Sequence, residues 1–441
     1  MTDLAEWTRS ADLDALREWI EQTGTLDIAE DIARLEPDER ALTFRLLPRD
    51  RALTVFEALD PVHQQDVLEA LRDERVVQIM EALDPDDRAR LFEEMPAKVV
   101  RRVLAGLSPL ERSYTAALLG YPEDSAGRIM TPEFVLLRAS MTAADALAKI
   151  RRTPSEPETL TMMPVGDDQR RLLGVVRLAR LVQAPPSRAV SELVEEETYR
   201  VSAFDDQEAA ARLVAEADLL SLPVVDSEDR VVGVITVDDA MRILEEEVTE
   251  DLHLAGGTEP LGRPYFSVTV RQLAAKRVVW LLALVAAATL TVNVLGYFED
   301  TLASVVTLAL FIPLLTGTGG NTGAQASTVV IRAMALDEVR LADLPRVVWR
   351  EARVGLVLGS MLAVIGFLPV SIFFGTDLAT VVSLTLLAVC AWATFAGSML
   401  PLLAKRVGVD PAVMSAPLIT TLVDATGLLM YFLIARAILG I

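Results

Sequence analysis

The sequence predicts a multidomain protein: an all-α superhelical domain, two copies of an α/β unit, a connector helix and a helical transmembrane domain. Three observations predict this order. Charged and apolar residues are segregated, because residues 1–270 carry 54 acids and 30 bases, whereas residues 271–441 carry 9 and 11. A repeat of 24 residues occupies the first part of the acidic region. A strand–helix pattern occurs twice in its second part.

The composition excludes several classes of function. The acidity of residues 1–270 argues against nucleic acid and anionic lipid as partners, and it favours cations. The single cysteine, Cys390, excludes a disulfide framework, and two distant histidines give little support for a zinc or copper site. The acidic first 21 residues have no apolar core, so no cleavable signal peptide is expected.

The first domain, residues 1–125, is predicted to be a superhelix of short helices that acts as a scaffold or an interaction surface. Its repeated motif is Leu35-Glu-Pro-Asp-Glu-Arg40, Leu59-Asp-Pro61, Leu83-Asp-Pro-Asp-Asp-Arg88 and Leu107-Ser-Pro-Leu-Glu-Arg112. An acid or Ser before Pro is typical of an N-cap followed by Pro in the first helical turn.

Residues 126–240 have an α/β pattern. In the first copy a strand is expected to start at Gly127 to Pro132, and a helix is expected at 142–152. A β-rich stretch that ends at 173–177 follows. The second copy has a helix at 207–217 between strands, and a further strand from Val231. This order, twice, is that of a tandem CBS pair, although Pro154 to Pro157 interrupts the first copy. CBS pairs often bind adenine nucleotides such as ATP, and a scaffold role without nucleotide is equally open.

The connector, residues 241–270, is expected to continue as an acid-rich helix into the membrane domain. Glu247 and Asp251 are four residues apart, so two like charges share one helical face. Such a pair is mildly destabilising unless a cation neutralises it. A solvated helix face is the alternative interpretation.

The transmembrane domain, residues 271–441, contains apolar stretches near the ~20 residues that a bilayer requires. Five spans are expected, at 278–297, 301–331, 354–374, 379–403 and 412–436. Lys and Arg gather before the first span and in the second and fourth connections, and they are absent from the first and third. This asymmetry predicts a cytoplasmic N-terminus and an outside C-terminus, with only Arg436 on the outer side.

Two features within the spans point to ion transport. Asp424 is the only acid well inside a span, with Thr420 and Thr421 one turn before it. Pro417 is expected to free a backbone carbonyl near Val413. Carboxylate, hydroxyl and carbonyl oxygens are ligands that Mg²⁺ and Ca²⁺ prefer. A hydrogen-bonded Asp that joins two helices is the alternative.

The second feature is the glycine-rich stretch from Pro313 to Ser327. Its small residues, Gly319 and Gly320 among them, allow close helix packing, and its polar residues suit a cavity lining. Asn321 and Gln325 are four apart and share a face. Packing alone is the alternative, and the Walker lysine of a phosphate loop is absent.

The chain resembles the MgtE family of magnesium transporters in domain order and in several motifs. These are Pro-Leu-Leu-Thr-Gly-Thr-Gly-Gly-Asn-Thr-Gly at 313–323, Gly408-Val-Asp-Pro411, Thr421-Leu-Val-Asp-Ala-Thr-Gly427, and the connector acids that follow Val237-Asp-Asp239. The resemblance implies a homodimeric Mg²⁺ channel, not an enzyme, with Asp424 as the pore aspartate. Ala416 stands where some relatives carry Asn.

The resemblance also implies regulatory Mg²⁺ sites that close the pore when Mg²⁺ is abundant. The matching residues are Asp206, Glu208, Asp218, Asp239, Glu247, Glu250 and Asp251. In the first domain Asp86 fits the family pattern, but Arg90 replaces a second acid. Two other functions stay open: a membrane-anchored CBS nucleotide sensor and a secondary exchanger of Mg²⁺ for Na⁺ or H⁺.

Overall fold

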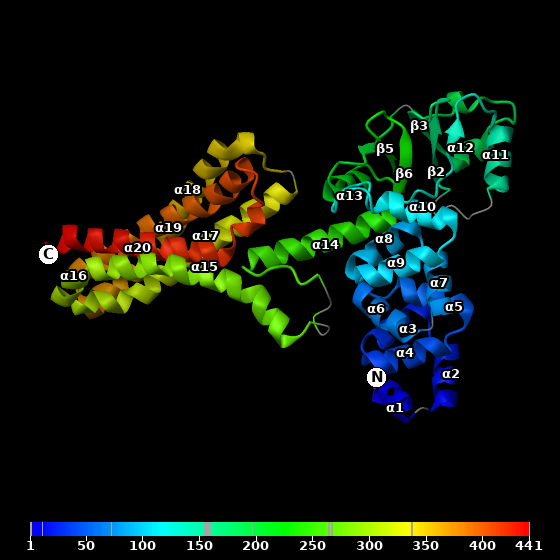
Figure 1. Ribbon diagram of the computed structural model, residues 1–441. Coiled ribbons are helices and arrows are strands. Elements are labelled where there is room, and N and C mark those ends of the chain that lie inside the picture. Colours follow the sequence, from blue (N-terminus) through cyan, green and yellow to red (C-terminus); the bar gives the residue numbers. More distant parts are fainter. Residues whose placement is uncertain are drawn as a thin grey trace. The chain divides into compact units, whose positions relative to one another are not determined.

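The structure is a computed structural model that describes residues 2–10, 12–71, 73–153, 160–195, 197–262, 265, 268–336 and 338–440. The chain forms two compact units, Met1–Glu247 and Val248–Ile441 (Figure 1). The first unit contains helices and two three-stranded sheets, and the second is helical in its described residues.

The N-terminal domain is a stack of short helices, as predicted. These are α1 (Thr2–Ser10), α2 (Leu13–Gln22), α3 (Thr25–Ala33), α4 (Pro37–Leu46), α5 (Arg49–Glu57), α6 (Pro61–Ala70), α7 (Asp73–Ala82), α8 (Pro85–Glu94), α9 (Ala97–Gly106) and α10 (Pro109–Leu118). From α4 onward a helix begins every 12 residues, so each 24-residue repeat is a helix pair. The repeated prolines lie in the first turn of their helices, where a missing backbone N–H costs nothing.

The capping prediction was only partly correct. Ser108 Oγ accepts a hydrogen bond from the Glu111 backbone N–H at 3.4 Å. The side chains of Glu36, Asp60 and Asp84 make no such bond, although they occupy the same position in their repeats. Their carboxylates therefore remain available for other contacts.

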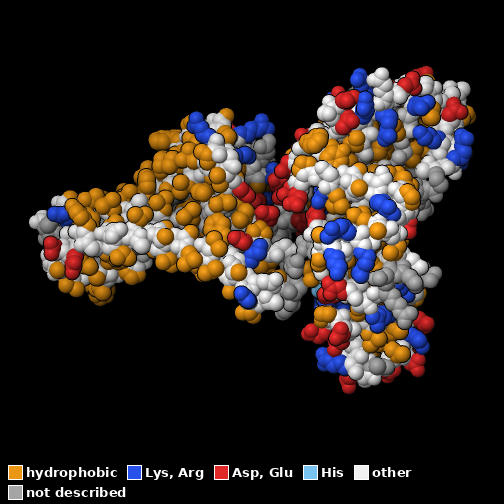
Figure 2. All heavy atoms as spheres, viewed as in Figure 1, with side chains coloured by type: hydrophobic (Ala, Val, Ile, Leu, Met, Phe, Trp, Pro, Cys, Tyr) orange, Lys and Arg blue, Asp and Glu red, His pale blue; other side chains and the backbone are white. Residues whose placement is uncertain are grey.

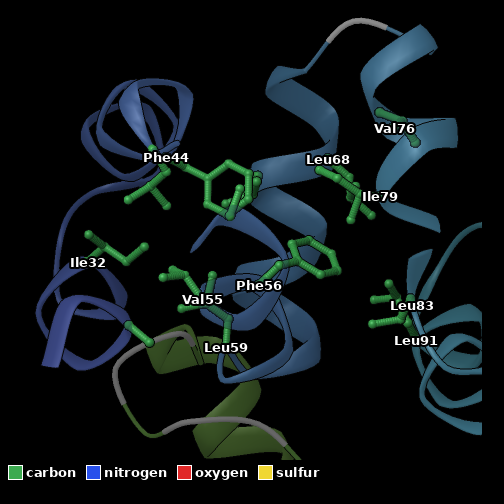
Figure 3. Packing of buried hydrophobic residues seen from close by; sticks show 14 of the residues in the cluster. Ile32, Phe44, Val55, Phe56, Leu59, Leu68, Val76, Ile79, Leu83 and Leu91 are labelled. Carbon is green, nitrogen blue, oxygen red and sulfur yellow. The ribbon is translucent and has the colours of Figure 1, made fainter. Parts of the chain in front are cut away.

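The core of this domain runs along the stacked helices (Figure 3). Phe44 and Phe56 are fully buried and meet edge to face, with ring centroids 6.1 Å apart. Leu83 and Leu91 of later repeats belong to the same cluster. The domain therefore holds its shape through one continuous apolar core.

The CBS pair has two sheets of the same topology. The elements are β1 (Leu137–Arg138), α11 (Ala143–Arg152), β2 (Met162–Gly166), β3 (Leu172–Arg177), α12 (Leu178–Gln183), η1 (Val190–Glu192), β4 (Val201–Ser202), α13 (Gln207–Glu216), β5 (Ser221–Val225) and β6 (Val231–Thr236). In each sheet the first strand pairs parallel with the second, and the second pairs antiparallel with the third. The predicted tandem pair is confirmed; Pro154 and Pro157 lie outside the described residues.

The prediction that a strand starts at Gly127 to Pro132 is wrong, because the first strand is β1 at Leu137–Arg138. Only Thr131 forms an isolated bridge there, with Val234 of the second copy. The backbone N–H of Gly127 donates to the carbonyl of Ala203 at 2.9 Å, again in the second copy. This segment therefore links the two copies instead of extending the first sheet.

The connector helix α14 (Val237–Ala255) begins directly after β6. It is shorter than the predicted connector of residues 241–270, because the helix ends at Ala255. Gly257 follows with a positive φ of 69°, a conformation that glycine adopts without strain.

The membrane unit continues with α15 (Val270–Tyr297), α16 (Glu299–Ser304), η3 (Val306–Phe311), α17 (Ile312–Ala335), η4 (Leu341–Asp343), α18 (Leu344–Phe374), α19 (Thr376–Arg406), η5 (Pro411–Val413) and α20 (Ala416–Leu439). Among the described residues, four helices are long and apolar enough to cross a membrane, namely α15, α18 with η4, α19 and α20. The predicted second span at 301–331 is the broken element α16–η3–α17. Its glycines and polar residues lower its hydropathy below that of the other four.

Apolar side chains dominate the visible face of this unit (Figure 2). Helix α19 lies at the centre of the bundle and packs against α17, α18 and α20. Helix α15 buries none of its residues within the chain. Its exposed leucines and valines therefore face lipid or another protein surface.

Candidate functional site

The membrane carboxylate, Asp424, lies in the third turn of α20. Its Oδ1 atom is buried, and it accepts no hydrogen bond from the part of the chain that the structure describes. An orphaned carboxylate oxygen in an apolar span is costly, so it needs a cation, water or a partner chain. The alternative was an Asp that joins two helices through a hydrogen bond. Within the described chain Asp424 makes no such bond.

The start of α20 differs from the sequence expectation. Pro417 lies in the first turn of α20, so no carbonyl of a preceding turn is freed. The Val413 carbonyl accepts a hydrogen bond from the Ser415 N–H at 2.7 Å. The expectation of a free carbonyl near Val413 is therefore wrong.

The two threonines before Asp424 have different contacts. Thr421 Oγ1 donates to the Pro417 carbonyl at 2.9 Å, and Thr420 Oγ1 points at the Gly320 carbonyl of α17 at 3.5 Å. Both hydroxyl oxygens keep lone pairs that a hydrated cation can use. Ala416, one turn earlier, offers only its backbone.

The glycine-rich stretch forms α17 and presents two different faces. Gly319 and Gly320 are buried against α19 and α20: a Cβ on Gly320 would lie 2.6 Å from Thr420 Cγ2, and one on Gly319 would lie 2.5 Å from Val389 Cγ1. Asn321 and Gln325 lie on an exposed face, and their amides make no hydrogen bond to any described residue. The stretch therefore combines close packing on one side with exposed polar side chains on another.

The chain after the connector helix touches the start of α20. A Cβ on Gly257 would lie 3.3 Å from Pro417 Cγ and 3.5 Å from Ser415 Oγ. Ser327 of α17 donates to the Met414 carbonyl at 3.3 Å, next to the same turn. A movement of the 256–257 segment can therefore reach the helix that carries Asp424.

The predicted regulatory acids of the CBS pair lie at several places. Asp206 caps α13, since its Oδ1 accepts from the Glu208 and Ala209 N–H groups at 2.8 and 3.2 Å. Glu208 forms an ion pair with Arg212. Asp218 lies beyond the other end of α13, about 15 Å along the helix, so a single chain does not bring it to Asp206.

Two of the predicted acids of α14, Asp239 and Glu247, have different neighbours. Glu247 accepts a hydrogen bond from Gln207 Nε2 at 3.0 Å, which brings it to the start of α13. Asp239 instead lies among residues of the N-terminal domain. Glu250 and Asp251 lie further along α14, in the second unit.

The clearest carboxylate cluster joins Asp239 to α8. Oxygens of Asp86, Asp87 and Asp239 lie within 4.8 Å of one another, and Asp86 and Asp239 are each only 5% exposed. Two arginines accompany them, since Arg242 pairs with Asp239 and Arg90 lies 3.0 Å from Asp87. Burial raises the pKa of Asp239, and the Arg242 charge opposes this shift.

Three comparisons with known proteins can be set beside this geometry. Family models match residues 24–124 ("MgtE intracellular N domain"), 126–187 and 190–246 ("CBS domain"), and 312–434 ("Divalent cation transporter"). The magnesium transporter MgtE of Thermus thermophilus is 39% identical over 99% of this chain and 98% of its own. The chain belongs to the MgtE family of magnesium transporters.

Two further MgtE proteins support this assignment. The Bacillus subtilis magnesium transporter MgtE is 34% identical over 73% of this chain and 71% of its own length. A crystal structure of the cytosolic domain of the Mg²⁺ channel MgtE in complex with ATP covers 54% of this chain and 98% of its own, with 35% identity and a TM-score of 0.51. The predicted fold order and the membership in a magnesium transporter family are thus confirmed.

Several acids of the N-terminal domain in this MgtE chain were not predicted from the sequence as site residues. Asp87 completes the carboxylate cluster, and Glu57 lies near Asp84 and Asp87. Burial, and then the charges of Asp84 and Asp87, raise the pKa of Glu57 to about 7. The repeated Leu-Asp-Pro motif was the available signal, because it places acids at the helix starts of successive repeats.

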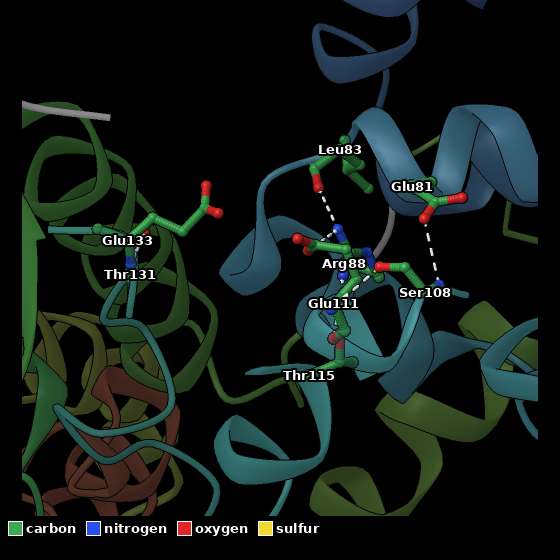
Figure 4. Close-up of polar contacts among 8 residues, drawn as sticks. All are labelled: Glu81, Leu83, Arg88, Ser108, Glu111, Thr115, Thr131 and Glu133. Carbon is green, nitrogen blue, oxygen red and sulfur yellow. Dashed lines mark hydrogen bonds and ion pairs between the residues drawn. The ribbon is translucent and has the colours of Figure 1, made fainter. Parts of the chain in front are cut away.

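The same domain contains a buried arginine that looks functional but has a structural role. Arg88 is 0% exposed, and its guanidinium donates to Glu111, to the Thr115 hydroxyl and to the Leu83 carbonyl (Figure 4). All of these partners lie in the N-terminal domain. Arg88 therefore holds α8 to α10.

Proposed function

We propose that the chain forms a homodimeric channel for passive Mg²⁺ uptake, and that Asp424 receives the ion. The observation that carries this proposal is the buried, unpartnered Oδ1 of Asp424 in a membrane helix. Mg²⁺ gives up its water reluctantly and usually keeps several waters. Two Asp424 copies across a two-fold axis can hold such a hydrated ion through its waters.

The exposed face of α17 supports a dimer with a wet pore. Asn321 and Gln325 place their amides on an exposed face of a helix in the membrane unit. A polar group that meets hydrocarbon without a partner costs several kcal/mol. A second copy of the chain and a water-filled path between the copies would satisfy these amides, while Gly319 and Gly320 keep α17 close to α20.

Regulation is proposed to use Mg²⁺ at the cytosolic acids. Asp206, Glu208, Asp218, Asp239, Glu247, Glu250 and Asp251 remain the candidate residues, together with Asp86. At low Mg²⁺ their charges repel, and at high Mg²⁺ bound ions draw the acidic surfaces together. To change a closed-to-open ratio from 1:99 to 99:1, bound ions must supply about 5.5 kcal/mol, which several weak sites can share.

The contact at the start of α20 supports a route for this signal. Gly257 follows the connector and touches Pro417 and Ser415. A shift of the connector would therefore move the turn from which α20, and with it Asp424, begins.

The proposed orientation places the acidic unit in the cytoplasm. Basic residues gather in the connections on that side, and the outer connections have none. Arg436 is the exception, and its guanidinium lies over the Phe298 ring, 5.9 Å from the centroid. This cation–π contact would hold the charge at the outer interface.

ATP binding at the CBS pair is a second candidate function, because one similar cytosolic domain was crystallised with ATP. Calorimetric titration of ATP into the purified chain tests it, with and without Mg²⁺. Heat that saturates at one nucleotide per chain would support the proposal, and no heat at millimolar ATP would refute it.

Uptake into proteoliposomes tests the transport proposal. Under an inside-negative potential, wild type and Asp377→Asn should take up Mg²⁺ in a saturable manner, and Asp424→Asn should lose this uptake. Asp377 is the matched control because it is an exposed acid at the start of α19. Equal uptake by Asp424→Asn would remove Asp424 from the mechanism, and dependence on a proton gradient at fixed potential would favour an exchanger.

A further inference from the structure

The surface between the N-terminal domain and the connector carries two facing rows of charges. Helix α8 belongs to the first, and the start of α14 belongs to the second. Both rows contain acids with an arginine among them. We define the α8–α14 ion-pair cluster as Asp86, Asp87 and Arg90 of α8 with Asp239, Arg242 and Glu246 of α14.

Each arginine of this cluster reaches across to the other helix. Arg90 lies 3.0 Å from Asp87 on its own helix and 3.8 Å from Glu246 on α14. Arg242 pairs with Asp239 on its own helix and lies 3.8 Å from Asp87 on α8. Two guanidinium groups therefore cross-link the N-terminal domain to the connector.

The burial of the cluster makes these contacts significant. Asp239 is 5% exposed and also accepts a hydrogen bond from Thr236 Oγ1 at 2.6 Å. The arginine side chains are both 26% exposed. Charges in such partly buried positions are screened less by salt than those on an open surface.

The two arginines neutralise part of the charge of the three clustered carboxylates, so these carboxylates need no bound cation. Without the arginines, Asp86, Asp87 and Asp239 would repel at less than 4.8 Å and require a bound cation. With them, four acids face two fixed positive charges. A divalent ion entering this cluster must compete with groups that already occupy its carboxylates.

We propose that Arg90 and Arg242 are built-in counter-ions that keep the N-terminal domain docked on the connector without Mg²⁺. The docking of this domain then does not depend on the Mg²⁺ concentration. Under this proposal Asp86 and Asp239 are withdrawn from the candidate regulatory residues. Sensing falls to the acids outside the cluster, which are Asp206, Glu208, Asp218, Glu247, Glu250 and Asp251. The inference rests on the proposed regulation by Mg²⁺, but docking can be measured without any ion flux.

Spin-label distance measurements on the full chain in detergent test this proposal. Labels are attached at Glu30→Cys, in the N-terminal domain, and Glu216→Cys, in the CBS pair, in a Cys390→Ala background. Both label positions are exposed and lie outside the cluster. The expected result is the same narrow distance distribution in two conditions. One is EDTA, and the other is a Mg²⁺ concentration ten times the one that closes the channel.

The variant Arg90→Ala/Arg242→Ala should give a broad distribution in EDTA, because the cluster then loses the two positive charges that link α8 to α14. Mg²⁺ should narrow it again. Arg90→Lys/Arg242→Lys keeps both charges, and its N-terminal domain should stay docked in EDTA. This result would show that the broad distribution of the double alanine variant comes from the lost charges and not from misfolding. Arg101→Ala/Arg230→Ala removes one charge from each domain away from the cluster, and it should behave as wild type.

A wild-type distribution that broadens in EDTA as much as that of the double alanine variant would overturn the proposal. So would a double alanine variant that stays docked in EDTA. The effect of Asp424→Asn on transport does not affect either docking result. Failure of the channel proposal is therefore distinguishable from failure of the docking proposal.

Discussion

Replacement of Gly397 by Ala should separate two membrane helices. A Cβ at this position of α19 would lie 2.3 Å from the backbone oxygen of Gly323 on α17, and ordinary contact begins at 3.4 Å. Neither atom belongs to a side chain that can rotate away. The two helices must therefore move apart by about 1 Å.

The magnitude follows from two opposing effects. Overpacking costs about 1–3 kcal/mol, and a backbone collision belongs at the upper end. The better helix propensity of Ala returns about 1 kcal/mol. The net loss of about 2 kcal/mol should lower the melting temperature of the membrane unit by roughly 4–8 °C.

Gly366→Ala is the matched control for this prediction. Its Cβ would meet only Leu386 Cδ1 at 3.7 Å, an ordinary contact in a neighbouring helix. It should keep the propensity gain of about 1 kcal/mol and raise the melting temperature by about 2–4 °C. Thermal unfolding in detergent, followed by tryptophan fluorescence, measures both. A shift of the same sign in the two variants would refute the packing argument.

Three further predictions concern the N-terminal domain and the CBS pair. The pKa of Glu57 is raised from 4.5 to about 7 in the folded state, so this group should make the N-terminal domain more stable as pH falls from 7 to 4.5. Glu57→Gln should remove this pH dependence of the melting temperature, which melting curves at pH 5, 6.5 and 8 measure. Arg88→Leu leaves Glu111 without its partner and should cost about 3–5 kcal/mol by urea unfolding, part of which Glu111→Gln restores. Asp206→Asn keeps the α13 cap, so it should unfold as wild type does but should weaken the inhibition of transport by internal Mg²⁺. Asp206→Ala removes the cap and should in addition lower the free energy of unfolding by about 1 kcal/mol.

Much of the architecture could be predicted because its signals are local. The prolines at 37, 61, 85 and 109 mark helix starts to the residue, since Pro in the first turn has a local cause. The two CBS copies and most of the apolar spans follow from periodicity. The second span was harder to predict, because Gly319, Asn321 and their neighbours make α17 polar for a membrane helix.

The failures have non-local causes. The strand expected at 127–132 does not form because its backbone bonds go to residues about 75–100 positions later in the second CBS copy. The cluster of Asp86, Asp87 and Asp239 joins residues about 150 positions apart, so no spacing rule could find it. The prediction of Asp424 as a pore residue rests on a local signal, because it is a single acid in an apolar span.

The most direct test of the account is the reversal potential of Mg²⁺ current through the reconstituted chain. A tenfold Mg²⁺ gradient is worth about 1.4 kcal/mol, and two charges gain about 4.6 kcal/mol per 100 mV. A passive Mg²⁺ pore should therefore shift its reversal potential by about 30 mV for each tenfold change in Mg²⁺, and Asp424→Asn should abolish the current. A current that Asp424→Asn leaves intact, or a reversal potential that follows the proton gradient, would contradict the account.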